Sequence, residues 1–255
     1  MSKFHVTAIV NAHKEGLWLK PALDSVWACF EAARERGLTT ELLVAMDRAD
    51  ALSVEIVSDS VARFPHVRVV PMNHGDVGHA RNQAASLAEG EYVAFLDGDD
   101  LWGATWIADA FAMASADARE LVLHPEVNVY FGYDPHVFVH VDAEAKNFDA
   151  AALALVNYWT SLCFVRREFL MENPYPETDL AAQIGYEDWA WNLKVMSAGA
   201  IHKCVPGTGH AIRMKQISLV RQTSSAGCIA EPSDIFKKII KTQAKKSNSK
   251  LRIAA

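Results

Sequence analysis

The chain has few cysteines, no long apolar run and no glycine-rich phosphate loop. Its four cysteines lie far apart and form no CxxC pair: Cys29, Cys163, Cys204 and Cys228. That spacing argues against a disulfide framework or a zinc site and favours reduced thiols in a cytosol. No stretch of about 18 uncharged apolar residues occurs, so we expect no membrane-spanning helix. The N-terminal residues 1–16 are typical of a first strand rather than a secretion signal, and we expect a cytoplasmic protein.

Charge of one sign is concentrated in only one segment. The 255 residues carry 25 basic and 31 acidic side chains, for a formal net charge of −6. An acidic balance is unusual for a nucleic-acid-binding protein, so we expect no nucleic-acid partner. Residues 237–252 hold seven basic side chains and no acid, whereas the remainder holds 18 basic and 31 acidic side chains. The body is therefore acidic and the C-terminal tail is basic.

Apolar periodicity in the first hundred residues alternates between strand and helix. Strands are predicted at 4–10, 41–46, 67–70 and 91–96, and helices at 19–30, 54–64 and 78–88. This alternation predicts parallel strands with right-handed crossovers, in a Rossmann-like α/β half whose sheet is covered by helices. After residue 120 the pattern is less regular, with strands predicted at 121–131, 137–141 and 201–205 and a helix at 187–198.

Polar residues follow every strand of the predicted parallel sheet. They are Asn11 and His13, Asp47 and Asp50, Asn73 and His74, and Asp97, Asp99 and Asp100. Because ligands bind at the carboxyl ends of parallel strands, we expect a binding site at this edge.

Three carboxylates occur within the four residues Asp97-Gly98-Asp99-Asp100. Unpaired, they would repel one another and raise one another's pKa values. Mg²⁺ or Mn²⁺ prefers oxygen ligands and commonly binds one or two carboxylates together with substrate phosphates. The run therefore indicates a divalent-cation site, and the alternative interpretation is an N-terminal cap of the helix that follows.

Five segments in order resemble the family 2 glycosyltransferases of the GT-A fold, over roughly residues 4–215. They are the strand and turn at 6–15, the strand and loop at 41–50, Asn73 with the Gly78-His-Ala-Arg-Asn82 segment, the 97–100 run that resembles the family's DxD metal motif, and Gly185-Tyr-Glu-Asp-Trp189. The chain departs from the family pattern at Asn11, His13, Met46 and Arg48. These departures bear on which nucleobase the protein binds, more than on whether it is active.

The resemblance implies roles for particular residues. Nucleotide-sugar contacts are implied for Asn11, His13, Glu15, Asp47, Asn73, Arg81, Asp97, Asp100, Arg213 and Lys215. Metal ligation is implied for Asp99 and His210, catalysis by a general base for Asp188 with Glu187 as its competitor, and acceptor binding for Trp159 and Trp189.

Structural roles are the alternatives for several of these residues. His13 could be a surface turn residue, Arg81 an exposed helix ion pair and His210 a structural histidine. The two tryptophans could be core residues, and Glu187 with Asp188 could complement the dipole of a helix N-terminus.

The resemblance further implies an inverting, metal-dependent transfer (Mn²⁺ or Mg²⁺) from a nucleoside-diphosphate sugar, with UDP favoured, to a saccharide or lipid-linked saccharide of a bacterial envelope polymer. The alternatives are a catalytically silent nucleotide-sugar or glycan-binding module and a sugar nucleotidyltransferase. The latter would need a glycine-rich loop after the first strand, where this chain has Asn11-Ala-His-Lys-Glu15.

We expect one domain over residues 1–236, comprising a nucleotide-sugar half (1–102) and an irregular acceptor-binding half (103–236). The basic tail (237–255) adjoins the apolar residues Ile235, Phe236, Ile239 and Ile240. An interfacial helix on the anionic inner face of the cell membrane is one prediction for it. A solvated, frayed terminus is the other.

Overall fold

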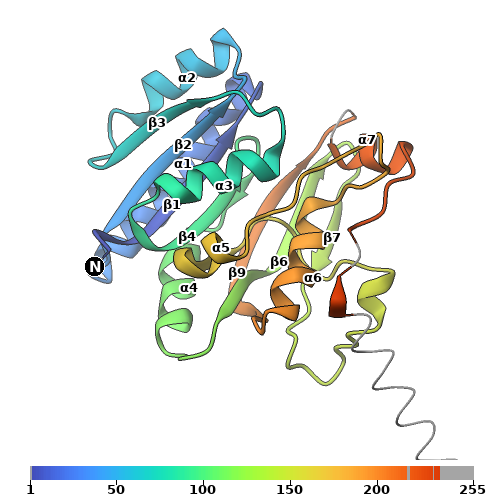
Figure 1. The fold of residues 1–255 in the computed structure, drawn as a ribbon. Coiled ribbons are helices and arrows are strands. Elements are labelled where there is room, and N and C mark those ends of the chain that lie inside the picture. Colours follow the sequence, from blue (N-terminus) through green and yellow to red (C-terminus); the bar gives the residue numbers. More distant parts are fainter. Residues whose placement is uncertain (1, 217–218, 232, 236–255) are drawn as a thin grey trace, which may run out of the picture.

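A computed structural model describes residues 2–216, 219–231 and 233–235, and within them nine strands form one sheet (Figure 1). The strands are β1 (Phe4–Ala12), β2 (Thr40–Asp47), β3 (Val67–Met72), β4 (Gly90–Asp97), β5 (Leu101–Trp102), β6 (Leu121–Gly132), β7 (His136–Val139), β8 (Phe164–Arg166) and β9 (Ile201–Met214). Their order is β3-β2-β1-β4-β8-β6-β9-β5, with β7 paired to β6.

The N-terminal half has the predicted parallel arrangement. β1 pairs in parallel with β2 and with β4, and β2 pairs in parallel with β3. The crossovers are α1 (Leu19–Glu35), α2 (Ala51–Val61) and α3 (Val77–Leu87). The predicted α/β class and mostly parallel sheet are confirmed, and the carboxyl ends of β1, β2 and β4 lie at one edge.

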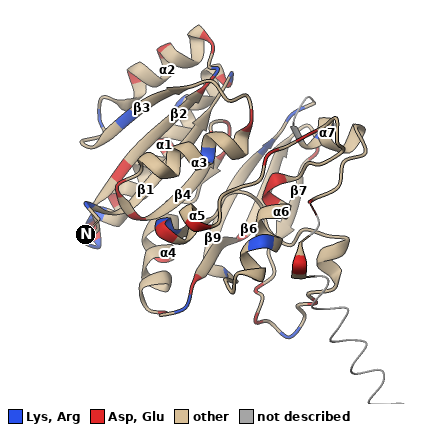
Figure 2. Ribbon diagram, viewed as in Figure 1, with Lys and Arg blue, Asp and Glu red and all other residues tan. Residues whose placement is uncertain are grey.

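The C-terminal half continues the same sheet. β8 is antiparallel to both β4 and β6, whereas β9 runs parallel to β6 along most of its length. The helices of this half are α4 (Trp106–Ser115), α5 (Arg167–Glu172), α6 (Glu187–Ser197) and α7 (Leu219–Ser225), and a short 3-10 turn lies at Ala152–Ala154. A second 3-10 turn, Gly16–Trp18, precedes α1 in the N-terminal half. Figure 2 shows acidic residues in red at the start of α6.

Two apolar layers sandwich the sheet because side chains alternate along each strand. Val6, Ala8 and Val10 of β1 face a core that contains residues of α1, α2 and α4. Ile9 faces the opposite core, to which α3, α5 and α6 contribute. Continuous apolar strands are therefore explained by burial on both faces.

The structure departs from the sequence prediction in three places. The last strand runs beyond Val205 to Met214, because its backbone pairs with β6 over nearly its whole length. The short strands β5 and β8 and the helices α5 and α7 have no predicted counterpart, and the helix that follows the acidic run, α4, has Thr105 rather than Asp99 or Asp100 at its N-cap. Asp50 caps α2, its side chain accepting a hydrogen bond from the backbone N–H of Ser53 at 2.9 Å, so it serves the helix rather than the binding edge.

No helix among the described residues is long and apolar enough to cross a membrane. Residues 236–255, and with them the predicted interfacial helix, lie outside the described residues.

The short strand β8 joins the two halves, and its residue Phe164 is fully buried against Tyr92 and Trp106. We expect Phe164→Ala to lower the free energy of unfolding by about 3–5 kcal/mol, because it removes a large side chain and leaves a cavity. Urea denaturation followed by circular dichroism measures this loss. Val54→Ala, at an exposed position of α2, is the control and should change stability far less.

Candidate active site

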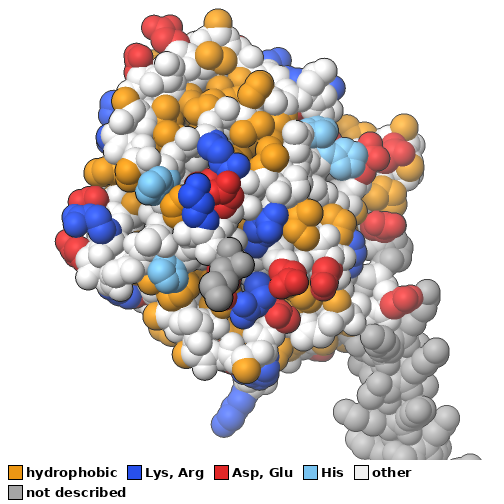
Figure 3. Space-filling model, turned by 60° about the vertical axis from the view of Figure 1, so that its left-hand side comes forward, with side chains coloured by type: hydrophobic (Ala, Val, Ile, Leu, Met, Phe, Trp, Pro, Cys, Tyr) orange, Lys and Arg blue, Asp and Glu red, His pale blue; other side chains and the backbone are white. Residues whose placement is uncertain are grey.

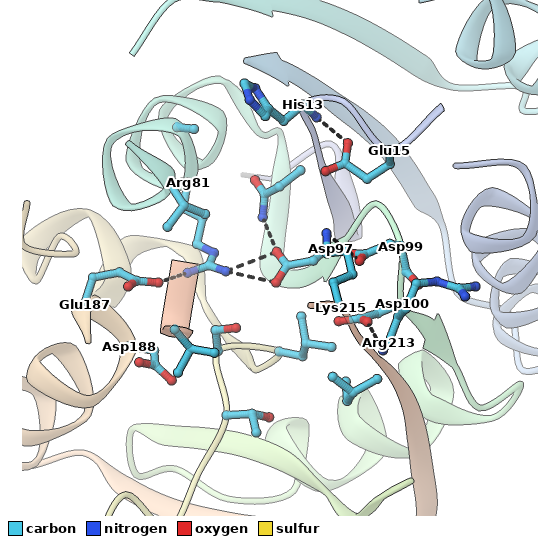
Figure 4. A pocket seen from close by; sticks show the side chains of 18 of the residues that line it. His13, Glu15, Arg81, Asp97, Asp99, Asp100, Glu187, Asp188, Arg213 and Lys215 are labelled. Atoms are coloured by element: carbon cyan, nitrogen blue, oxygen red, sulfur yellow. Dashed lines mark hydrogen bonds and ion pairs between the residues drawn. The ribbon is translucent and has the colours of Figure 1, made fainter. Parts of the chain in front are cut away.

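A cavity of about 490 Å³ opens at the carboxyl ends of β1, β2 and β4, between them and the start of α6 (Figure 4). Its lining comes from both halves of the chain. Of the residues predicted from the sequence, the structure brings twelve to this cavity: Asn11, His13, Glu15, Asp47, Arg81, Asp97, Asp99, Asp100, Glu187, Asp188, Arg213 and Lys215.

Gly98 allows the acidic run to turn back against β1. Its backbone N–H donates to the carbonyl of Asn11 at 2.8 Å. A Cβ at this position would lie 2.7 Å from a methyl of Leu19 and 2.9 Å from that same carbonyl oxygen. The close approach requires glycine, and it holds the carboxylates on either side at the cavity.

At one end of the cavity, Asp47 organises the loop that follows β3. Its two carboxylate oxygens accept the backbone N–H groups of His74, at 2.6 Å, and Gly75, at 2.7 Å. His13 is held nearby, with its Nδ1 2.6 Å from the carbonyl oxygen of Asp47. This end is thus built from pre-oriented polar groups of β1, β2 and the 74–75 loop.

Arg48 has a role that the sequence interpretation did not give it. Its guanidinium donates to the side-chain oxygen of Asn73 and to the carbonyl of His74, both at 3.0 Å. It therefore reinforces the same loop. Asn73 is exposed, contacts Arg48 and is not among the lining residues, so the structure does not bring it to the cavity.

The guanidinium of Arg81 in α3 lies between the two halves and is almost completely buried. It donates to Glu187 at 2.9 Å and to the two oxygens of Asp97 at 3.1 and 3.4 Å, and it lies over the ring of Tyr175. Burial opposes its charge, but the Asp97 and Glu187 carboxylates outweigh that effect and raise the pKa of Arg81. The alternative of an ion pair on an exposed helix face is wrong, because this ion pair is buried.

Glu187 and Asp188 begin α6 after Tyr186, whose backbone is left-handed with φ 55°. Such a conformation is uncommon for a residue other than glycine and is found at functional sites. The hydroxyl of Tyr186 lies 2.9 Å from that of Ser224 in α7. The turn directs Glu187 to Arg81 and leaves the Asp188 carboxylate facing the cavity, with Asn157 donating to it at 3.3 Å (Figure 4).

The two carboxylates therefore have different chemistry. Glu187 is ion-paired with Arg81. Burial and the neighbouring Glu187 raise the pKa of Asp188 to about 7. A carboxylate with a pKa near neutrality can accept a proton from an acceptor hydroxyl more readily than an ordinary aspartate can.

Opposite Asp188, the acidic loop after β4 carries two further buried carboxylates. Burial raises the pKa of Asp99, and burial with Asp99 and Asp97 raises the pKa of Asp100 well above its usual range. Asp99 is paired with the ammonium of Lys215 at 2.7 Å. Asp100 accepts the backbone N–H of Arg213 at 2.7 Å. The end of β9 and the residue that follows it thus supply a backbone N–H and an ammonium to the acidic loop.

The donor set at this loop suits a hard divalent cation that also binds phosphate oxygens. Among the described residues, seven carboxylates but three Arg or Lys side chains line the cavity. No group of three or more His, Cys, Asp or Glu side chains that could hold a metal ion by itself occurs in this part of the chain. A cation held by one or two carboxylates together with a diphosphate fits both observations.

Besides Asn73, three predicted residues lie away from the cavity lining. His210 is buried with its ring edge-on to Trp106 at 4.8 Å, and burial lowers its pKa well below the usual range. Trp159 is buried, stacks on His202 at 3.9 Å and donates to the carbonyl of Val141. Trp189 packs in the same cluster and donates to the carbonyl of Leu153. The metal role of His210 and the acceptor roles of the tryptophans gain no support, because these rings are occupied by core packing.

Several further residues line the cavity without having been predicted from the sequence. They are Tyr130, Thr160, Ser161, Leu162, Tyr186, Val220 and Thr223. Tyr186 adjoins Glu187 within the Gly185–Trp189 motif, so its position in the sequence was a usable signal. The others lie in β6, in the 160–162 segment and in α7, which only the tertiary fold brings together at the cavity.

The fold and the cavity define a protein of the GT-A glycosyltransferase class. Residues 7–172 match the sequence model of Glycosyl transferase family 2, and the chain belongs to that family. The match ends before Glu187, so the positions of the later site residues come from the structure.

Curated relatives are distant and longer than the region matched. The chain is 32% identical to the uncharacterised glycosyltransferase YibD of Escherichia coli over 95 residues, which are 37% of this chain and 28% of YibD. It is 24% identical to the uncharacterised protein Mb1547 of Mycobacterium bovis over 192 residues, which are 72% of this chain and 51% of that protein. The chain therefore spans about half or less of these relatives.

Solved structures confirm the fold. Residues 1–349 of TarS from S. aureus, in complex with UDP-GlcNAc, superpose with a TM-score of 0.61 at 18% identity, over 91% of this chain and 63% of that one. The mannosyltransferase PcManGT from Pyrobaculum calidifontis, in complex with GDP-Man and Mn²⁺, superposes with a TM-score of 0.62 at 17% identity, over 96% of this chain and 70% of that one. At these identities the likeness shows the GT-A fold alone.

Arg81 offers a direct test of the buried ion-pair network. We expect Arg81→Met to lower the free energy of unfolding by about 3–5 kcal/mol, because it leaves Asp97 and Glu187 near each other without their shared cation. Chemical denaturation at pH 7 measures the change. Arg34→Met removes an exposed ion pair with Glu31 and should leave stability nearly unchanged. Equal effects of the two substitutions would contradict the central role of Arg81.

Proposed function

We propose that this protein transfers a sugar from a nucleoside-diphosphate sugar to a hydroxyl of a saccharide or lipid-linked saccharide, with inversion. One observation carries the proposal. Asp188 faces the same cavity as the acidic loop of Asp97, Asp99 and Asp100, while the neighbouring Glu187 is ion-paired with Arg81. A base and a donor-binding loop on opposite sides of one cavity suit an in-line displacement.

The nucleoside would lie at the end formed by β1, β2 and the 74–75 loop. His13 lies beside Asp47 there, and Asp47 is itself held by two backbone N–H groups. Uracil remains our favoured base. TarS was solved with UDP-GlcNAc and PcManGT with GDP-Man, so a comparison of UDP and GDP should decide the preference.

The diphosphate would lie near Asp99, Arg213 and Lys215, which line the cavity on the side away from Glu187. Asp99 would hold Mn²⁺ or Mg²⁺, which when bound would neutralise charge on the diphosphate. The side chains of Arg213 and Lys215 are placed to offset the negative charge that develops as the diphosphate leaves.

Asp188 would remove the proton of the acceptor hydroxyl. The acceptor oxygen would then form a bond to the anomeric carbon while the bond from that carbon to the phosphate oxygen breaks. The electron pair leaves with the nucleoside diphosphate, and the proton stays on Asp188. The reaction needs one carboxylate that can take the proton of the acceptor hydroxyl. Because Glu187 is ion-paired with Arg81, Asp188 is the better candidate for this base.

We further propose a cytoplasmic location and a peripheral membrane contact through residues 237–255. We also propose a single domain over residues 1–236, divided at residue 102, and the continuous sheet supports treating its two halves as one unit.

Release of nucleoside diphosphate from UDP- and GDP-sugars in the presence of Mn²⁺ tests the function. We expect Asp188→Asn to lower kcat by about 10²–10⁴-fold, because the acceptor loses its base, while UDP binding measured by calorimetry is retained. Asp59→Asn, at an exposed position of α2, is the charge-matched control and should keep full turnover. Nucleotide-sugar binding without turnover for any donor would instead favour a silent binding module.

The pH profile supplies a second test. Because the pKa of Asp188 is raised to about 7 and the base must be ionised, we expect kcat/KM to rise about tenfold per pH unit below 7 and to level off above it. Initial rates between pH 5 and 9 measure this profile. A rate that is flat from pH 5 to 7 would contradict the assignment of Asp188.

A further inference from the structure

Each of the three carboxylates of the acidic loop has a partner within the protein itself. Arg81 pairs with Asp97, the backbone N–H of Arg213 donates to Asp100, and Lys215 pairs with Asp99. On the face shown in Figure 3, Lys and Arg side chains gather with Asp and Glu side chains near the centre. In the loop that we propose to hold a divalent cation, Asp97 and Asp99 therefore already have a cationic partner, whereas Asp100 has a neutral one.

Of the three partners, Lys215 is the one that can move away from its carboxylate, Asp99. Arg81 has 2% of its side chain exposed and is fixed between two carboxylates, and the third partner is a backbone group of β9. Lys215 follows the last residue of β9, and 31% of its side chain is exposed. A lysine ammonium on a flexible four-carbon stem changes partners more easily than a buried, bidentate guanidinium.

The ammonium of Lys215 lies on the cavity side of Asp99. In the position paired with Asp99 it is also 5.7 Å from the ring of Trp18, whose face Arg213 covers at 4.8 Å. Both Lys215 and Arg213 line the cavity. An anion bound there would therefore lie near the Lys215 ammonium and could replace Asp99 as its partner.

Asp99 cannot serve Lys215 and a divalent cation equally well at the same time. Its side chain is 8% exposed, so the two cations would meet in a poorly solvated place where like charges repel strongly. Conversely, a bound cation would remove the need for the ammonium at Asp99. The two ligands of Asp99 are therefore alternatives.

We propose that Lys215 is a built-in counterion that occupies Asp99 in the donor-free protein and moves to the diphosphate when a divalent cation and nucleotide bind. Lys215 thereby couples the binding of the cation to the binding of the nucleotide. The assignment of the anion as a diphosphate rests on the proposed function. The competition at Asp99 rests on the ion pair itself.

The exchange predicts effects of opposite sign on two affinities. Without nucleotide, Lys215 competes with the cation, so Lys215→Met should bind Mn²⁺ about 10-fold more tightly. With Mn²⁺ present, the same variant lacks a cation for the diphosphate, so it should bind UDP and GDP about 10-fold more weakly. A permanent structural ion pair would not produce this combination.

The experiment titrates the full chain with Mn²⁺, following free Mn²⁺ by electron paramagnetic resonance, and with UDP or GDP by calorimetry at saturating Mn²⁺. No acceptor and no turnover are needed. Lys20→Met is the control, because it removes a lysine from an exposed ion pair with Asp24 in α1, outside the cavity lining, and gives the same net charge. Lys215→Arg should behave like the wild type towards Mn²⁺, since it keeps a cation at Asp99.

Tighter Mn²⁺ binding together with weaker nucleotide binding, in Lys215→Met and not in Lys20→Met, would establish the exchange. Unchanged or weaker Mn²⁺ binding in Lys215→Met would overturn it, as would unchanged nucleotide binding. Lys215→Gln provides a second neutral variant if the methionine substitution perturbs folding. If transfer is never detected, the proposed function fails while the metal titration still decides what Lys215 does at Asp99.

Discussion

The buried guanidinium of Arg81 is the interaction on which the site depends. It reaches from α3 to Asp97 at the end of β4 and to Glu187 at the start of α6, so a single cation ties the N-terminal half of the chain to the C-terminal half. Two carboxylates that would otherwise repel are held together, and the cost of burying the cation is offset by its two ion pairs. The distance across the cavity, and with it the position of Asp188, follows from this arrangement.

Around that fixed pair, the site keeps groups whose charge can change. Asp188 adjoins Glu187 but faces the cavity, and its raised pKa reflects burial beside another carboxylate. Asp99 and Asp100 are buried with raised pKa values, and they rely on groups at the end of β9. Rigid pairing by Arg81 and exchangeable pairing by Lys215 thus divide the acidic lining into a structural part and a part open to ligands.

The topology explains why residues far apart in sequence meet here. Parallel β1, β2 and β4 bring Asn11, Asp47 and Asp97 to one edge. β9 runs parallel to β6 and pairs with β5, which follows the acidic loop directly, so the residues after Ala211 arrive beside Asp99. The family match over residues 7–172 covers the first of these contributions but not the second.

Periodicity along the first hundred residues determined the parallel half and its binding edge, because each strand and its polar end are local in sequence. The motifs likewise identified Asp97–Asp100 and Glu187–Asp188. Only the tertiary structure decided which of these groups are free, since pairing joins residues as distant as Arg81 and Glu187. It also placed His210 and Trp159 in the interior, because histidine and tryptophan suit either a core or a site. Sequence thus supplied the chemical groups, and long-range packing decided their partners and their protonation.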